Sequence, residues 1–187
     1  EVQARVLVAQ KCPRNSVAAL EKAVESCKQL AVAQTAFYKF PRGGETVSGE
    51  SIGLAVELAR CWGNIDYGIM ELARGDRETE MLAFAWDLET NTVSRQTFIV
   101  PHTRDTRQGP RALTDTRDIY ENNANNGARR LRECIFRVLP PHLKEAAKTT
   151  CYATLERGEG EKPLTVRIAE AVAAFKNSGI ALDRLEK

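Results

Sequence analysis

Two acidic residues near the middle of the chain have the spacing of a metal-binding pair. Asp87 and Glu89 lie two residues apart, so they share one face of a predicted strand, and Glu71 can lie on the neighbouring strand. Carboxylates paired in this way can hold Mg²⁺ for phosphodiester cleavage. No lysine follows at the two-residue spacing that a nuclease strand commonly offers. A polar sheet rim is therefore the favoured interpretation, and a metal-dependent nuclease that uses Asp87 and Glu89 is an alternative.

No other group of residues has the spacing that covalent catalysis requires. His102 and His142 have no cysteine or carboxylate at zinc-ligand spacing, and no Ser–His–Asp set can be identified. Gly43 and Gly44 lack the Gly-Lys-Ser/Thr sequence of a phosphate-binding loop, so no nucleotide hydrolysis is indicated. We therefore expect a protein that is not an enzyme, with no catalytic residue, no bound metal and no cofactor.

Arginine is concentrated in one part of the chain. Residues 95–137 carry nine arginines, no lysine and five acidic residues, a net charge of +4, although the whole chain of 187 residues carries only +2. The planar guanidinium group matches phosphate oxygens and stacks on nucleobases, so contact with nucleic acid is the favoured interpretation. The alternative is a solvated surface neutralised by acidic neighbours, since surface ion pairs are common and weak. These neighbours are Asp105, Asp115, Asp118 and Glu133.

A helix from Asp115 to Pro140 must position many of these arginines. Its apolar residues recur at steps of three and four, which is the helical period. They are Ile119, Tyr120, Ala124, Gly127, Ala128, Leu131, Ile135 and Val138. Asn122, Asn126 and Arg129 project to the opposite side. We therefore expect one face of this helix to be buried and the other to grip a polyanion.

Four asparagines lie close together in this helix, although asparagine is a poor helix former. They are Asn122, Asn123, Asn125 and Asn126. One interpretation is that their amides form hydrogen bonds with a phosphate, a base edge or a neighbouring subunit. The other interpretation is that this part of the helix is frayed or forms a loop.

A short basic segment with two aromatic residues precedes a pair of glycines. Tyr38 and Phe40 alternate with Lys39, and Arg42 stands directly before Gly43-Gly44. The aromatic rings are candidates for stacking on bases, but they could equally belong to the core. The backbone amides around the glycines could approach an anion closely. A hairpin or a strand-to-helix turn explains the glycines at least as well.

The order of predicted elements is that of an α+β domain with one antiparallel sheet. Residues 1–12 form a strand or a helical lead-in, an additional strand spans Ala36–Arg42, residues 43–46 form a turn, and Pro101–Thr114 is a loop. The other expected elements are helix Val17–Gln34 with Ser16 as its N-cap, helix Ile52–Trp62 ended by Gly63-Asn64, strands Ile65–Leu72, Glu80–Leu88 and Val93–Val100, and helices Leu143–Leu155 and Thr165–Asn177. The predicted fold is thus a three-stranded antiparallel meander plus an additional strand, packed against a long basic helix and flanking helices.

Length, composition and cysteine usage indicate one core of ordinary domain size. The five cysteines are scattered without a CxxC pair, so we expect buried, reduced thiols in a cytosolic protein. No apolar run approaches the roughly 20 residues that span a bilayer, and no signal peptide is visible. Because the sequence begins at Glu1 without a methionine, we expect a segment of a longer protein. We expect a core domain over residues 1–157, and a linker with a C-terminal helical segment over residues 158–187.

Five short motifs lie between residues 36 and 140. They are Arg42-Gly43-Gly44, Gly49-Glu50-Ser51-Ile52 with Leu54-Ala55, Trp62-Gly63-Asn64-Ile65, Trp86-Asp87-Leu88-Glu89-Thr90-Asn91 and Ala128-Arg129-Arg130-Leu131-Arg132. Together with the order of strand and helix, meander and long basic helix, these motifs resemble phage-type single-strand annealing proteins of the RecT/Redβ/Erf kind, a superfamily of recombination mediators. The chain departs from the best-known members because it lacks their lysine-rich character.

The resemblance implies ATP-independent binding of single-stranded DNA and annealing of complementary strands in phage-type homologous recombination. It also implies homo-oligomeric rings or helical filaments, with the DNA in a groove between the meander and the helical part. The groove positions that it matches are Arg42, Arg104, Arg107, Arg129, Arg130 and Arg132. With the candidates from the residues themselves, the expected DNA-binding set is Lys39, Arg42, Arg104, Arg107, Arg111, Asn122, Asn126, Arg129, Arg130 and Arg132.

The same resemblance implies partners and a location. Beyond single-stranded DNA and the annealed duplex, the expected partners are a phage exonuclease and a host single-strand binding protein, and no membrane is expected. The expected location is the cytoplasm of a bacterial host, with the gene carried by a phage or prophage. Two alternatives stay open: the metal-dependent nuclease, and a self-assembling scaffold protein whose basic face serves contacts between subunits.

Overall fold

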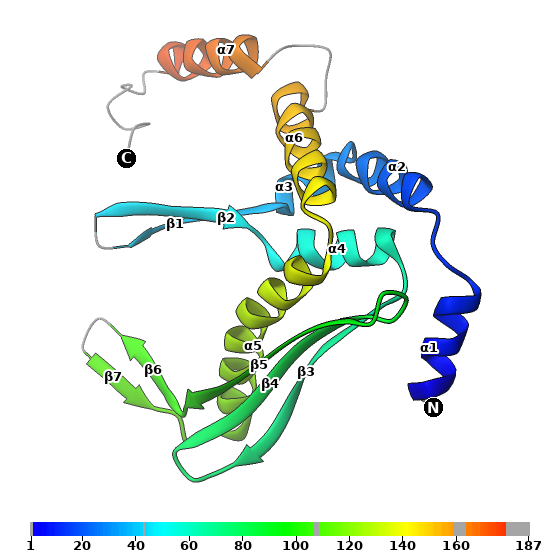
Figure 1. The fold of residues 1–187 in the computed structure, drawn as a ribbon. Coiled ribbons are helices and arrows are strands. Elements are labelled where there is room, and N and C mark those ends of the chain that lie inside the picture. Colours follow the sequence, from blue (N-terminus) through cyan, green and yellow to red (C-terminus); the bar gives the residue numbers. More distant parts are fainter. Residues whose placement is uncertain (1, 43, 107–108, 159–163, 179–187) are drawn as a thin grey trace.

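The chain folds as an α+β structure in which helices lie along one face and at one end of a three-stranded antiparallel sheet (Figure 1). The computed structural model describes residues 2–42, 44–106, 109–158 and 164–178. The helices are α1 (Val2–Lys11), α2 (Ser16–Cys27), α3 (Leu30–Thr35), α4 (Ile52–Trp62), α5 (Thr116–Val138), α6 (Pro141–Arg157) and α7 (Leu164–Asn177). The strands are β1 (Phe37–Arg42), β2 (Glu45–Glu50), β3 (Ile65–Arg74), β4 (Glu78–Asp87), β5 (Thr92–Pro101), β6 (Thr103–Thr106) and β7 (Gly109–Ala112). The predicted fold class is therefore confirmed.

Strands β3, β4 and β5 form the predicted meander, each antiparallel to the next. The two faces of the sheet differ, because every second side chain of β4, from Thr79 to Asp87, is buried and those between are half-buried. Ala83 and Ala85 occupy the centre of the buried row and are fully inaccessible. Such small residues let a helix come close to the sheet.

Helix α5 packs on this alanine-bearing face. Cys134 is fully buried, and its thiol lies 3.6 Å from the carbonyl oxygen of Ala83. Gly127 rests against β3, where a Cβ atom would lie only 2.9 Å from Cδ1 of Ile69, so glycine permits the close approach. As the sequence predicts, the helix begins after Asp115, whose carboxylate accepts hydrogen bonds from amides of the first turn.

The buried face of α5 differs from the prediction at its N-terminal end. Tyr120, expected on the apolar face, is 66% exposed, whereas Asn123 is buried. Positions 119, 123 and 127 form one row at four-residue steps, and this row faces the sheet, so position 120 turns outward. Ile135 and Val138 are buried as expected.

Helices α2, α3, α4 and α6 pack together at one end of the sheet (Figure 1). Leu54 and Leu58 of α4, Leu143 of α6 and Cys27 of α2 are almost completely buried in this cluster. The bounds of α4 are those that the sequence predicts. This cluster holds the N-terminal end of α4, which directly follows strand β2.

The single helix predicted over residues 17–34 is wrong, because it is broken into α2 and α3. Gln29 has an extended backbone between them, and the change of direction lets both helices contact α6. The predicted cap is also wrong: Asn15, not Ser16, accepts hydrogen bonds from the amides of Val17 and Ala18.

Two hairpins form where the sequence predicted turns and loops. β2 pairs with β1 along its whole length, so the hairpin interpretation of the glycine pair is confirmed and the additional strand has a partner of its own. β6 and β7 pair within the predicted loop Pro101–Thr114. In the described part of the chain the strands therefore form three separate sheets, and the expectation of a single sheet is wrong. Short segments rich in glycine and proline carry little periodicity, so only cross-strand pairing defines them.

The structure describes helices near both ends of the chain. The N-terminal segment is helical, and α7 contains no buried side chain among the described residues. Most of the expected linker, residues 159–163, lies outside the described part, so the division at residue 158 stays a prediction.

The cysteines agree with the prediction in part: four are buried free thiols, but Cys12 is exposed, contrary to expectation. In the described ranges, no helix has the length and apolar character needed to cross a membrane.

Arg14 ties the segment before α2 to the far end of the meander. Its side chain is only 8% exposed and forms a two-pronged ion pair with Asp87, which is 2% exposed. The guanidinium also lies 3.1 Å from the carboxylate of Glu89 and 5.1 Å from the ring of Trp62. Burial by itself raises the pKa of Asp87, but the hydrogen bonds from Arg14 and from backbone amides outweigh it and lower the pKa.

We predict that Arg14→Ala destabilises the fold by about 3 kcal/mol, because it leaves the Asp87 carboxylate buried without its partner. The matched control is Arg5→Ala, which removes the exposed ion pair with Asp66 and should cost less than about 1 kcal/mol. Urea unfolding followed by circular dichroism measures both. Similar small losses in the two variants would contradict a structural role for Arg14.

The Asp87 carboxylate also predicts how stability depends on pH. Its pKa is lower in the folded chain than in the unfolded chain, so its contribution is present above pH about 4 and is lost as the pH falls through the folded value. In Arg14→Ala the burial of Asp87 is no longer offset, so the pKa of Asp87 in the folded chain rises and this loss of stability at acidic pH should shrink or reverse. Unfolding free energies measured across acidic pH test this, and identical pH profiles would refute it.

Candidate nucleic-acid interface

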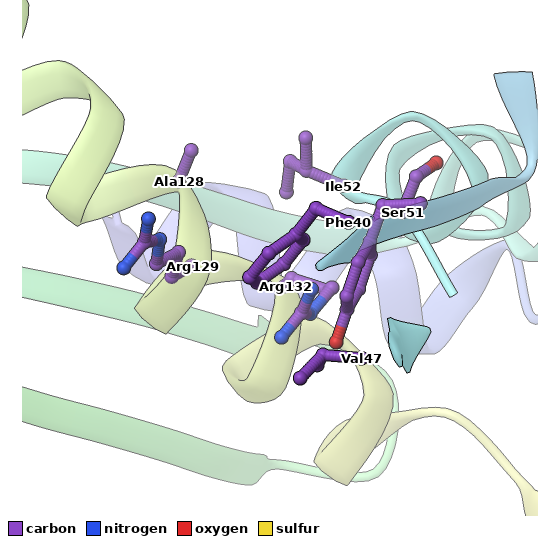
Figure 2. Close-up of a pocket in the computed structure, with 8 residues that line it drawn as sticks. Phe40, Val47, Ser51, Ile52, Ala128, Arg129 and Arg132 are labelled. Carbon is purple, nitrogen blue, oxygen red and sulfur yellow. The ribbon is translucent and has the colours of Figure 1, made fainter. Parts of the chain in front are cut away.

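A groove of about 380 Å³ lies between the β1–β2 hairpin and α5 (Figure 2). The hairpin supplies one wall, α5 supplies the other, and Ser51 and Ile52 at the start of α4 complete the lining. The lining residues are Tyr38, Phe40, Val47, Ser51, Ile52, Ala128, Arg129 and Arg132. The groove thus joins an aromatic wall to an arginine-bearing wall.

The aromatic wall consists of two residues on one face of β1. Tyr38 and Phe40 are two positions apart, so their rings project to the same side, with centroids 5.9 Å apart and planes inclined by 28°. Phe40 is 42% exposed. Of the two interpretations left open by the sequence, the structure favours a surface position over a core position for Phe40.

The opposite wall carries two guanidinium groups. Arg132 places its guanidinium carbon 4.9 Å from the centre of the Tyr38 ring and donates a hydrogen bond of 3.3 Å to the backbone carbonyl of Glu50. Arg129 is exposed, and Figure 2 shows it extending from α5 beside the groove. Within the described ranges, neither arginine forms a salt bridge.

The carboxylate of Glu50, whose backbone carbonyl accepts from Arg132, is neutralised by other residues. Glu50 pairs with Lys144 at 3.3 Å and Lys148 at 3.5 Å. Burial raises its pKa, but its hydrogen bond with the backbone and these two lysines lower the pKa overall, so the carboxylate stays ionised and engaged. The positive charge of the groove is therefore not cancelled from this side.

Arg130, expected beside Arg129, lies elsewhere. Its guanidinium is 5.9 Å from the ring of Phe98 on β5 and does not line the groove. Successive helical positions point about 100° apart, which separates the two side chains. Lys39 is exposed, but alternation along β1 directs it away from Tyr38 and Phe40.

The asparagines of α5 are largely engaged within the protein. Asn122 donates to the carbonyl of Pro101 at 3.1 Å, and Asn126 donates to the carbonyl of Asn122 at 2.9 Å. Asn123 is buried, and neither polar atom of its side chain has a partner in the described part of the chain. The helix is continuous here, so the frayed-helix interpretation is wrong. Contact of Asn122 or Asn126 with DNA stays a prediction.

The β6–β7 hairpin presents a second pair of arginines. Arg104 and Arg111 are cross-strand partners, and both are exposed. Like charges directly opposite each other destabilise a hairpin, so this pair would be relieved by a polyanion. In the view of Figure 1 both hairpins project from the same side of the molecule. Arg107 and the side chain of Arg42 lie outside the described part, so their predicted roles are not tested.

The carboxylates considered for a metal are committed to arginines. Asp87 and Glu89 both contact Arg14, and Glu71 pairs with Arg74 at 2.7 Å. The register of β3 and β4 places Glu71 opposite Met81, far along the strand from Asp87. Among the described residues no group of three potential ligands could hold a metal ion. The geometry therefore does not support the alternative nuclease site.

The two histidines occupy structural positions. His102 is buried, with its Nε2 atom 2.7 Å from the hydroxyl of Thr79, and His142 lies edge-on to the ring of Trp62. Two residues that line the groove, Val47 and Ala128, were not expected there from the sequence. The signal for Val47 is its place after the glycine pair, which puts it opposite Phe40 once the hairpin is recognised.

Comparisons of this chain with protein-family models, curated proteins and solved structures gave no match.

The opposed arginines generate a prediction about the β6–β7 hairpin. Arg111→Gln should stabilise the hairpin by a few tenths of a kcal/mol at low salt, because it removes the repulsion from Arg104. Slower amide hydrogen exchange in β6 and β7 measures this, and the difference should vanish near 1 M salt, where charges are screened. Exchange that is faster in the variant, or slower at every salt concentration, would contradict it.

Proposed function

We propose that this chain binds single-stranded DNA in the groove between the β1–β2 hairpin and α5 and anneals complementary strands without ATP. The observation that carries the proposal is the meeting of the exposed Phe40 ring with guanidinium groups that form no salt bridge within the described residues. Proteins that bind single strands combine these two features, because bases stack on aromatic rings and phosphates require cations. The resemblance in motifs and element order supports the same function.

The groove suits a single strand better than a duplex. In a duplex the flat faces of the bases are covered by their neighbours, so a ring such as that of Phe40 has nothing to stack on. A single strand can turn bases toward the ring while its phosphates lie on Arg129 and Arg132. Bases outside the groove remain free to pair with a second strand, and pairing breaks no covalent bond.

One groove on a chain of net charge +2 binds weakly, so we propose that several copies act together as a ring or filament. Repetition along one strand adds counterion release from each subunit and raises the effective concentration of every groove. An exonuclease and a host single-strand binding protein are proposed partners on the basis of the resemblance, and the cytoplasm of a bacterial host is the proposed location.

A self-assembling scaffold is a second candidate, favoured by the face of the sheet opposite α5. Met70, Val93 and Ile99 are each between 42% and 51% exposed on this face, where exposed apolar groups commonly mark interaction surfaces. The surface also suits contacts within a DNA-bound oligomer. The two candidates differ in whether assembly depends on DNA.

Annealing of labelled complementary strands tests the proposed function. Without ATP or metal, the chain should accelerate annealing well above the protein-free rate, because the groove holds one strand with its remaining bases free. An unchanged rate, with no affinity for single strands, would remove the proposal, and assembly that ignores both DNA and salt would then favour the scaffold. Strand cleavage with Mg²⁺ that is lost in Asp87→Ala would favour the nuclease instead.

Individual arginines should contribute unequally. Arg129→Ala should weaken single-strand binding about tenfold and reduce the slope of log affinity against log salt by about 0.7, because one phosphate contact is lost. Arg130→Ala should have a smaller effect, because that side chain lies over Phe98. The matched control is Arg117→Ala on the same helix, where the arginine already pairs with Glu121. Equal losses in all three variants would show that α5 acts only through its total charge.

A further inference from the structure

The aromatic wall of the groove is built by the hairpin. Gly49 is the cross-strand partner of Tyr38, and a Cβ atom at Gly49 would lie 2.7 Å from the Tyr38 hydroxyl oxygen and 2.9 Å from Cζ. Glycine on the neighbouring strand therefore lets the tyrosine ring lie across the hairpin. Any larger residue at position 49 would force the ring to move.

Contacts from α5 hold the same ring. The Arg132 guanidinium lies over Tyr38, and its hydrogen bond to the carbonyl of Glu50 fixes the guanidinium to the end of β2. A cation over an aromatic face is attracted by the electrons of the ring, so this contact stabilises the position of Tyr38. Tyr38 is thus fixed by the hairpin and by the helix, and it forms a rigid support for its neighbour on β1.

Phe40 is the ring left available at this support. It stacks beside Tyr38, pairs across the hairpin with Val47 and remains 42% exposed. Arg129 stands on the opposite wall of the groove. An exposed flat ring on a rigid support, with a cation on the facing wall, has the components that recognise one base and one phosphate.

We propose that this part of the groove is a subsite for one unstacked nucleobase, which stacks on Phe40 while the adjoining phosphate lies on Arg129. The inference rests on the proposed binding of single-stranded DNA and goes beyond it by assigning a base to a named ring. A volume of about 380 Å³ is near the lower end of the range for ligand pockets, so the subsite suits a single nucleotide and not a run of stacked bases.

The subsite accepts any base. The lining has two hydroxyl groups: that of Tyr38 lies against Gly49, and that of Ser51 is already engaged, because it donates to the carbonyl of Thr35 at 2.6 Å and accepts from the amide of Leu54. Ser51 therefore has little capacity left to read a base edge. Stacking is available to every base, so binding depends on the presence of a base and not on its identity.

Base capture also connects binding to pairing. A base held against Phe40 has to leave the ring before it enters a duplex, so pairing at that nucleotide removes its stacking contact. The strand is then held by phosphate contacts alone at this position. The subsite thus favours unpaired strands and weakens its own hold as annealing proceeds.

The test compares a thymidine oligonucleotide with an abasic oligonucleotide of the same length. Wild-type chain should bind the thymidine strand at least about tenfold more tightly, since stacking on an aromatic ring contributes a factor of this order per base. Phe40→Ala should remove this preference by weakening thymidine binding alone, with abasic binding and its salt slope unchanged. Phe40→Trp, which keeps an aromatic face, should preserve the preference.

The matched control is Phe175→Ala, which removes another partly exposed phenylalanine, on α7, and should change neither affinity. A Phe40→Ala variant that remains folded and binds both strands as wild type does, or binds both more weakly by the same factor, would overturn the subsite while leaving single-strand binding in place. No binding of either strand by the wild-type chain would overturn the proposed function and the subsite together.

Discussion

The close packing of α5 on the meander is the constraint on which the arrangement of the groove depends. Alanines in β4 and Gly127 in α5 bring the helix so near the sheet that its rotation is fixed. Once Cys134 and Ile135 face inward, Arg129 and Arg132 must face away from the sheet. The charged wall of the groove is therefore a direct result of the core packing on the other side of the same helix.

The β1–β2 hairpin supplies what the helix cannot. A strand places every second side chain on one face, so Tyr38 and Phe40 stand together and meet α5 across the groove. The helical cluster holds the end of α4 next to the hairpin, and Arg132 connects α5 to β2. Aromatic and cationic groups from distant parts of the sequence thus face one narrow space. This combination, and not the net charge, distinguishes the groove from a solvated arginine surface.

The features that the sequence predicts well are those set by local patterns. The apolar period of residues 52–62 and the alternation in β4 define α4 and the meander, because the side chains that decide them lie within a few residues of each other. The features that it misses depend on contacts between distant residues. Arg14 meets Asp87 across 73 positions, Gly49 matters only because Tyr38 lies across it, and the outward turn of Tyr120 follows from where the sheet lies. The candidate site can likewise be predicted only in part. The cluster of arginines in α5 is visible in the sequence, but only the packing of the helix shows that Arg129 lines the groove and Arg130 lies over Phe98.

Photo-crosslinking with a strand that carries 5-iodouracil identifies the side chains against which a bound base lies, because the halogenated base reacts with aromatic side chains that it touches. If bases stack on Phe40, crosslinks should lie in the segment Phe37–Arg42, as identified by mass spectrometry of the digested chain, and an unlabelled single strand but not a duplex should abolish them. Crosslinks confined to Trp86 and its neighbours on the opposite face of the meander, with none in Phe37–Arg42, would show that the strand does not bind in the groove.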